Sequence, residues 1–317
     1  MWSSSAKYRW SKTLLTGGLC LLFISLWTLP AQTQHLPHYG QYMFNGLVLN
    51  PAYAGHKKVL DLAFLNRTQW IGFAGAPRTV TFAAHAPSRN QKHSFGGTLM
   101  YDRLGARRMG QALGVYSYRL FLGEYALSFG IQGGLRNMGV NFSQLGNVDD
   151  GDPELQTPIP NLVLPQVGTG LWLSNRHFYL GLSVPELIRV RSNTYSLYYS
   201  NATYYRHLFA TVGGMLKLSP DLLLKPSILL KYVQAVPLQW DLNANLVFKD
   251  RFVVGASYRS SKTFLGLMEI YLTEQFRLGF AYEMNTGKLR TLQSGTSEIS
   301  LGYSFGFRVK TPDLRYF

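Results

Sequence analysis

The last sixty residues alternate almost strictly between bulky apolar side chains and small or polar ones. From Phe276 to Glu283, every second residue is Phe, Leu or Tyr, and Arg, Gly, Ala and Glu stand between them. Residues 252–259 and 299–308 repeat the pattern. A period of two predicts extended strands with two different faces. One face is aromatic and the other is too small and glycine-rich for a soluble exterior, which is typical of a closed barrel whose bulky face contacts lipid.

The rest of the chain can be divided in the same way into about fourteen strand-like segments, an even number of roughly ten residues each, as a tilted single-chain barrel requires. They are 58–70, 77–87, 93–103, 110–122, 124–138, 165–174, 176–184, 205–218, 221–232, 238–249, 251–260, 263–272, 274–284 and 297–309. The sequence therefore predicts an all-β protein, a transmembrane antiparallel β-barrel.

The connections between these segments give a second test of the barrel. Every second one is tight, as at 123–124 and 273–274, whereas 139–164, 185–204 and 285–296 are long. Short turns on one rim and long loops on the other are typical of bacterial outer-membrane barrels, with both termini in the periplasm. A soluble propeller or sandwich would not need short and long connections to alternate in this way.

The N-terminus has the pattern of an export signal. Lys7, Arg9 and Lys12 precede an apolar stretch at 13–29, and Leu29-Pro30-Ala31 suits cleavage after Ala31. A retained transmembrane anchor is the alternative. We expect a signal peptide at 1–31, a periplasmic or plug segment at 32–57, and an outer-membrane barrel at 58–317.

Composition argues against several other functions. The formal net charge of +15 invites a nucleic-acid partner, but the basic residues are dispersed along strands and turns rather than clustered. The seven His residues are scattered without the spacing of a catalytic set. We predict no enzyme activity, no metal, no cofactor and no nucleic-acid partner.

The segment before the first strand holds one local motif, Asn50-Pro51-Ala52-Tyr53-Ala54-Gly55. Asn is a good N-cap, Pro is favoured at the first helical position, and Gly suits a helix exit. A single helical turn that closes or lines the periplasmic mouth is expected, and an ordinary loop is the alternative.

Charged residues on the small face of the strands should point into the lumen. They are Arg119, Arg136, Arg259, Arg277, Arg308, Asp241 and Glu283. Because unpaired charges at close quarters are costly, we expect ion-pair networks, or segment 32–57 folded against them, in place of an open pore.

The long loops concentrate aromatic and apolar residues that could bind a partner. The candidates are Leu155, Ile159, Leu162, Leu187, Ile188, Tyr195, Leu197, Tyr198, Tyr199 and Tyr204. Some of the tyrosines could instead extend a lipid-facing aromatic girdle.

An ordered series of short motifs resembles one known family. They are Gln41–Asn45, Asn50–Gly55, Arg67–Phe73, Lys231–Val233, Gly255–Arg259 and Gly295–Ile299. Over about residues 38–309 the chain resembles the PorP/SprF outer-membrane proteins of the Bacteroidetes type IX secretion system. It departs from them at Ser297, where the family carries His, and at Gly46, where Pro is commoner.

The resemblance implies a barrel that works with the type IX machinery in the outer membrane. Such a barrel would support secretion and surface anchoring of a gliding or adhesion-type adhesin, and would recognise the adhesin's C-terminal domain. The alternative is a FadL-like channel for hydrophobic small molecules, since an Asn-Pro-Ala motif in an N-terminal hatch also resembles those transporters.

Overall fold

The computed structural model describes residues 38–140, 161–188, 206–234, 236–287 and 294–306. These residues form fifteen strands. The strands are β1 Leu60–Thr68, β2 Arg78–Pro87, β3 His93–Leu104, β4 Arg107–Leu122, β5 Tyr125–Val140, β6 Leu162–Ser174, β7 Phe178–Val184, β8 His207–Gly214, β9 Leu216–Ser219, β10 Leu222–Val233, β11 Gln239–Phe248, β12 Phe252–Arg259, β13 Thr263–Tyr271, β14 Phe276–Asn285 and β15 Thr296–Phe305.

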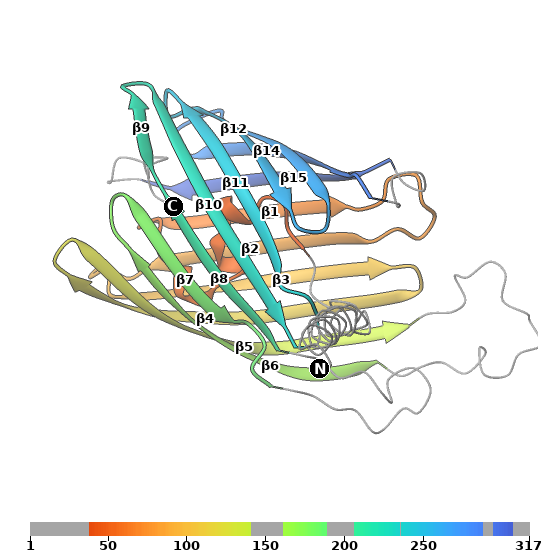
Figure 1. Cartoon of the computed structure of the whole chain (residues 1–317). Coiled ribbons are helices and arrows are strands. Elements are labelled where there is room, and N and C mark those ends of the chain that lie inside the picture. The colour runs from red at the N-terminus through yellow and green to blue at the C-terminus, as the bar shows by residue number, and fades with distance from the viewer. Residues whose placement is uncertain (1–37, 141–160, 189–205, 235, 288–293, 307–317) are drawn as a thin grey trace, which may run out of the picture.

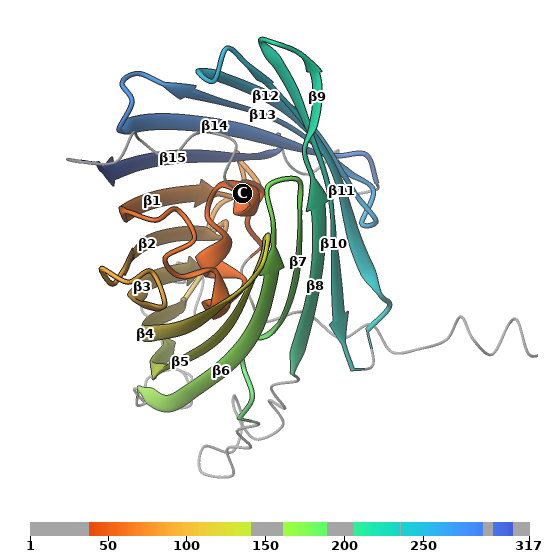
Figure 2. The same ribbon diagram turned by 90° about the vertical axis from the view of Figure 1, so that its left-hand side faces the viewer.

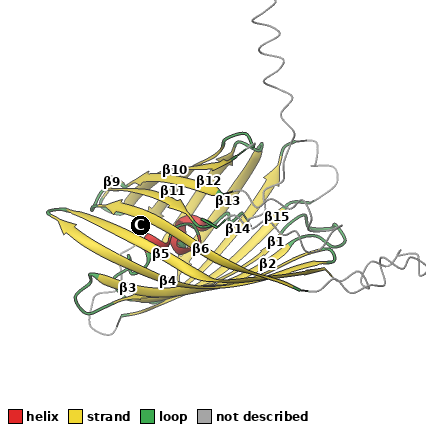
Figure 3. Ribbon diagram, turned by 90° about the horizontal axis from the view of Figure 1, so that it is seen from below, coloured by secondary structure: helices red, strands yellow, loops and turns green. Residues whose placement is uncertain are grey.

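The strands form a single antiparallel sheet that closes on itself (Figures 1 and 3). The barrel closes where β10 pairs with β11, because these two strands stand at opposite ends of the order in which neighbouring strands are hydrogen-bonded. β8 and β9 both pair with β10 and are separated by Met215, so together they serve as one wall strand. The wall therefore has fourteen strand positions, and the predicted antiparallel barrel is confirmed; the segment 205–218 is broken at Met215.

The two faces of the wall separate by residue type, as the alternation predicts. Leu278 of β14 and Leu301 of β15 are cross-strand partners, and both are exposed on the outside. The next pair in register, Gly279 and Ser300, faces the interior, where a Cβ on Gly279 would meet the Ser300 side chain. Large apolar side chains thus cover the outer surface, while Ser, Thr, Asn and charged residues line the inside.

The connections differ between the two rims. Residues 123–124, 175–177, 220–221 and 249–251 are tight turns at one end, called here the short-turn rim. The opposite end, the long-loop rim, carries the longest connections, at 141–161, 185–206 and 286–295. The expected signal peptide at 1–31 lies outside the described residues. No helix among the described residues is long and apolar enough to cross a membrane.

Residues 38–57, called here the plug, lie inside the ring of strands (Figure 2). They form three consecutive 3-10 turns: η1 Tyr42–Phe44, η2 Gly46–Val48 and η3 Pro51–Tyr53. The single helical turn predicted for Asn50–Gly55 is present as η3, with Asn50 as its N-cap, while η1 and η2 are additional turns that precede the motif. Hydrogen bonds from residue i+3 back to residue i close each turn, as from Phe44 N to Gln41 O (3.0 Å) and from Ala54 N to Pro51 O (3.2 Å).

Candidate functional site

The contact between plug and wall centres on Asn50, the N-cap of η3. Its Oδ1 accepts a hydrogen bond from Ala52 N (2.9 Å), as the motif predicts for an N-cap. Its Nδ2 donates to the backbone oxygens of Leu171 in β6 (2.9 Å) and Leu182 in β7 (3.1 Å). One amide therefore shapes the turn and fastens it to two strands of the barrel.

Inner-face glycines give the plug room to touch the wall. A Cβ on Gly130 of β5 would lie 2.5 Å from Ala52 Cα and closer still to Ala52 N. A Cβ on Gly170 of β6 would overlap the Asn50 side chain. The small face that the sequence shows is therefore a docking surface for the chain's own N-terminal segment.

Apolar contacts add to this docking surface. Leu47, Ala52, Tyr53 and Ala54 of the plug are buried in one cluster with five wall residues. The wall residues are Ala63, Ala83, Val115, Trp172 and Tyr179. The plug is thus held by hydrophobic burial as well as by hydrogen bonds.

A second anchor is the buried carboxylate of Glu298 in β15. It accepts hydrogen bonds from the backbone N–H groups of Gly40 (2.6 Å) and Gln41 (3.0 Å), and it pairs with Arg67 of β1. The side chain is only 1% exposed, so its charge depends on these donors. Glu298 therefore links the start of the plug to the wall.

An ion-pair chain continues from Arg67 around the inside of the long-loop half. Arg67 pairs with Glu283 (3.0 Å), which also contacts Arg259 (3.3 Å). Arg259 in turn contacts Asp241 (3.1 Å), and Asp241 contacts Lys231 (2.8 Å). Three cations alternate here with three carboxylates once Glu298 is included, which offsets the cost of burying each charge. We call this set the charge belt.

A separate group of charges lies toward the short-turn rim. Arg277 donates through both Nη atoms to Asp61 (2.8 and 2.9 Å), and Asp61 also pairs with Lys57 of the plug (3.1 Å). Burial, followed by the nearby Arg277 charge, lowers the pKa of Lys57 to about 8. This group ties the C-terminal end of the plug to β1 and β14.

The remaining predicted lumen charges have different surroundings. Arg136 is buried and pairs with Glu186, which follows β7 and folds inward. Arg119 is buried, and its Nε donates to Ser128 Oγ (3.2 Å), while its Nη2 has no hydrogen-bond partner among the described residues. Arg308 lies outside the described residues. Of the seven charges predicted for the lumen, the structure places six on the inside.

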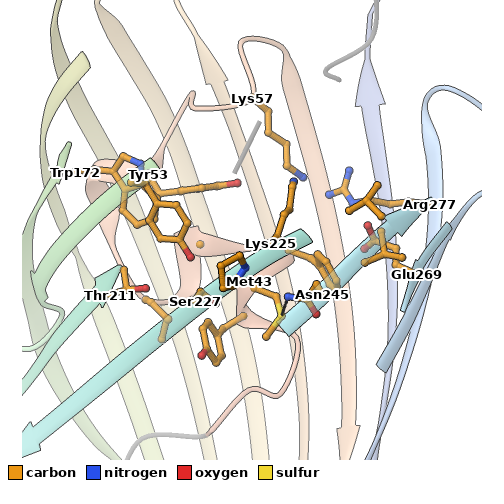
Figure 4. A pocket seen from close by; sticks show the side chains of 18 of the residues that line it. Met43, Tyr53, Lys57, Trp172, Thr211, Lys225, Ser227, Asn245, Glu269 and Arg277 are labelled. Carbon is orange, nitrogen blue, oxygen red and sulfur yellow. Dashed lines mark hydrogen bonds between the residues drawn. The ribbon is translucent and has the colours of Figure 1, made fainter. Parts of the chain in front are cut away.

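A pocket that is partly open to solvent lies beside the plug (Figure 4). Tyr53 and Trp172 line one side of it, and Lys57, Lys225 and Arg277 approach one another on the other side. Glu269 lies beside Arg277 on that side, so the pocket is aromatic on one side and charged on the other.

The predicted partner-binding residues are described only in part. Leu162 begins β6, and Leu187 and Ile188 follow β7, all at the long-loop rim, where Ile188 is exposed. Leu155, Ile159, Tyr195, Leu197, Tyr198, Tyr199 and Tyr204 lie outside the described residues. The predicted partner surface therefore stays a prediction.

Sequence reasoning missed several partners in the ion-pair networks. They are Arg67, Glu298, Asp61, Lys231 and Glu186. The alternation of inward and outward positions along a strand could have identified the first four, because each occupies an inward position of its strand. Glu186 lies beyond a strand end, where this alternation gives no information.

The described residues contain no group of three or more His, Cys, Asp or Glu side chains placed to hold a metal ion.

Among solved structures, the chain is similar to the CymD monoaromatic hydrocarbon channel, with 11% identity, a TM-score of 0.53, and coverage of 86% of this chain and 95% of that one. It also matches the Acinetobacter baumannii outer membrane protein Omp33 at 8% identity and a TM-score of 0.46, over 78% of this chain and 100% of that one.

At such low identity, the CymD match supports the barrel fold alone. No curated protein matches the sequence. A family model, described as the type IX secretion system membrane protein PorP/SprF, matches residues 31–303. The chain therefore belongs to the PorP/SprF family and is an outer-membrane β-barrel of the type IX secretion system.

Proposed function

We propose that this barrel supports the secretion of a partner adhesin and anchors the adhesin at the cell surface, as a docking platform rather than a conduit. The observation that carries the proposal is the filled lumen. Residues 38–57 are held on the inner wall by Asn50, by Glu298 and by a buried apolar cluster. A barrel whose interior is occupied by its own chain offers its rims to a partner.

The long-loop rim is the surface proposed for the adhesin's C-terminal domain. Exposed Ile188 and the predicted loop residues from Tyr195 to Tyr204 supply apolar and aromatic groups, which are favoured interface anchors. In the orientation usual for these barrels, this rim faces the outside of the cell. Gliding or adhesion would then be the property of the displayed partner.

The structure refines the deletion that tests this platform. Gln132 Nε2 donates to Pro185 O (3.0 Å), Glu186 pairs with buried Arg136, and Leu187 N donates to Val167 O (2.7 Å). Removing residues 185–188 would therefore damage the wall itself. A deletion of 189–204 keeps these contacts and removes the predicted loop.

The deletion strain should assemble a heat-modifiable barrel but lose surface display of its cognate adhesin, measured by antibody labelling of intact cells. Tyr198→Ser with Tyr199→Ser should weaken display in the same direction. Tyr125→Ser is the matched control, because Tyr125 is an exposed aromatic residue beside the short-turn rim. Normal display in the deletion strain would remove this loop from the platform.

A channel for hydrophobic small molecules is the second candidate, and the aromatic side of the pocket beside the plug favours it. Uptake of a labelled hydrophobic solute into proteoliposomes tests it. Transport that persists in the 189–204 deletion, together with intact adhesin display, would favour the channel over the platform.

A further inference from the structure

Arg119 of β4 is a buried arginine that has no carboxylate partner. Other inward arginines of the described wall each pair with a carboxylate: Arg67, Arg136, Arg259 and Arg277. Arg119 is only 4% exposed, yet no ion pair between described residues includes it. Its Nε donates to the neutral Ser128 Oγ (3.2 Å), and its Nη2 has no hydrogen-bond partner among those residues. A buried cation is costly unless it is paired, so an anion would complete the surroundings of Arg119.

Trp172 of β6 is a second buried donor, and it lies in the same row of the wall. Arg119 is the register partner of Ser128 in β5, and Ser128 is the partner of Trp172. Neighbouring strands are about 4.8 Å apart, so the row spans roughly 10 Å of backbone. Because the Arg119 Nε reaches Ser128, its guanidinium group extends over β5 toward the strand of Trp172. The indole Nε1 of Trp172 is also without a hydrogen-bond partner in the described part of the chain. Buried donors of this kind are rare, so two in one row indicate a site for an acceptor.

The plug lies against this row. The centroid of the His56 ring is 5.9 Å from that of the Trp172 ring and 5.2 Å from that of the Tyr53 ring. Ser117, the next inward residue of β4, donates from Oγ to Ala52 O (3.3 Å). A group bound in the row would therefore lie beside the plug as well as the wall.

The pocket beside the plug gives solutes access to the row. Tyr53 and Trp172 line its aromatic side, and the pocket is partly open to solvent (Figure 4). Val247 and Val253 also line it, and they flank the tight turn at 249–251. The pocket therefore extends to the short-turn rim, so a small molecule that enters there meets Trp172 beside the plug.

We propose that Arg119 and Trp172 bind the carboxylate of a small aromatic acid, whose ring occupies the pocket beside Tyr53. A guanidinium group matches a carboxylate in charge, and the two can form parallel hydrogen bonds. The Trp172 N–H supplies a further donor. An aromatic ring suits the pocket, because ligand sites are mostly apolar and carry a few placed polar groups. The bound acid would bridge wall and plug, and would thereby stabilise the seated plug.

The test measures binding of benzoate to the purified, folded barrel in neutral detergent by saturation-transfer NMR. Arg119→Gln should bind benzoate about 10- to 100-fold more weakly than the wild type, which is the scale of a hydrogen bond to a charged group. Arg119→Lys keeps the charge but not the planar fork, so its affinity should fall between the two. Trp172→Phe keeps an aromatic ring but removes the N–H donor, and it should bind severalfold more weakly.

Arg176→Gln is the matched control. It removes the same charge from an exposed turn on the short-turn rim, so it should bind benzoate like the wild type. Heat-modifiability on gels establishes folding for every variant.

Hydrogen exchange of the backbone amides of residues 46–54 tests the link to the plug. Benzoate should slow this exchange in the wild type and in Arg176→Gln, but not in folded Arg119→Gln. Exchange that saturating benzoate leaves unchanged in the wild type would show that the acid does not bridge plug and wall.

A ligand series tests the chemistry of the site. Benzamide is neutral and similar in shape, so it should bind about tenfold more weakly than benzoate, and acetate should bind more weakly because it lacks the ring. Equal affinity of benzoate for the wild type and folded Arg119→Gln would overturn the proposal. Benzamide that binds as tightly as benzoate would overturn the carboxylate, and acetate or inorganic phosphate that competes as strongly would overturn the aromatic acid. If Arg119→Gln gives no heat-modifiable barrel, Trp172→Phe and the ratio of benzoate to benzamide affinity in the wild type decide.

Discussion

Gly130 lies where the plug backbone touches the wall, and replacing it with alanine tests how closely the two fit. The new Cβ would lie 2.5 Å from Ala52 Cα and still closer to Ala52 N and the Pro51 carbonyl carbon. These are backbone atoms of a turn held by the Asn50 cap, so they cannot rotate away as a side chain would. Overpacking of this kind costs about 1–3 kcal/mol.

That cost applies only while the plug is seated, so Gly130→Ala should raise the population of the released plug by about 5- to 150-fold. Hydrogen exchange of the backbone amides of residues 46–54 in detergent micelles measures this population directly. Gly133→Ala is the control on the same strand, because Gly133 faces outward and the nearest atom to its new Cβ would be Gln166 O at 3.9 Å.

Protection of the plug amides should fall in Gly130→Ala and stay at the wild-type level in Gly133→Ala. Heat-modifiability on gels confirms that both variants keep the barrel. Equal protection in the two variants would refute the contact between η3 and β5, and with it the explanation given for the inner glycines.

Three further predictions address the wall and the plug. Leu278→Arg should destabilise the inserted barrel by about 2–4 kcal/mol if it lies near the midplane, whereas inward Ser300→Ala should be mild; urea unfolding of proteoliposomes measures both, and equal effects would contradict the assignment of faces. Glu298→Ala should lower the free energy of unfolding by about 3–5 kcal/mol, because it leaves buried donors unpaired. Replacement of the exposed Glu124 by Ala should change it by no more than about 0.5 kcal/mol in the same assay. A small loss in both variants would show that Glu298 is not an anchor. Burial and the Arg119 charge hold the pKa of His56 well below 6.5 in the seated plug, so the released plug binds a proton that the seated plug does not. Release of the plug should therefore increase as the pH falls below 6.5. Hydrogen exchange of the plug amides that is unchanged between about pH 7.5 and about pH 5 would contradict this.

The barrel was predictable from the sequence because lipid and lumen make opposite demands on alternate residues. Segments such as 251–260 and 274–284 carry that contrast along their whole length, so both the strands and their faces follow from the period of two. The ends of the strands were predicted less accurately. β4 begins at Arg107 rather than at residue 110, because no apolar alternation marks the end of the Gly105-Ala106 turn. The break at Met215 likewise leaves the alternation on either side intact.

The interior was harder to predict because its partners are far apart in the chain. Asn50 could be recognised as a cap, but its bonds to Leu171 and Leu182 depend on where the plug lies. Gly279 shows the same limit: alternation places it on the inner face, yet only the structure shows that a Cβ there would meet Gln41 of the plug as well as Ser300. Short-range patterns describe each strand and turn, whereas the plug is positioned by contacts between distant segments.

We propose that the N-terminal segment closes the barrel and that the barrel serves as a platform. Planar-bilayer recording compares the purified wild type with a heat-modifiable variant that lacks residues 38–57. We expect no large, steady conductance from the intact chain and an open, ion-conducting pore from the deletion. A large, steady conductance of the same size in both proteins would show that the plug does not close the barrel.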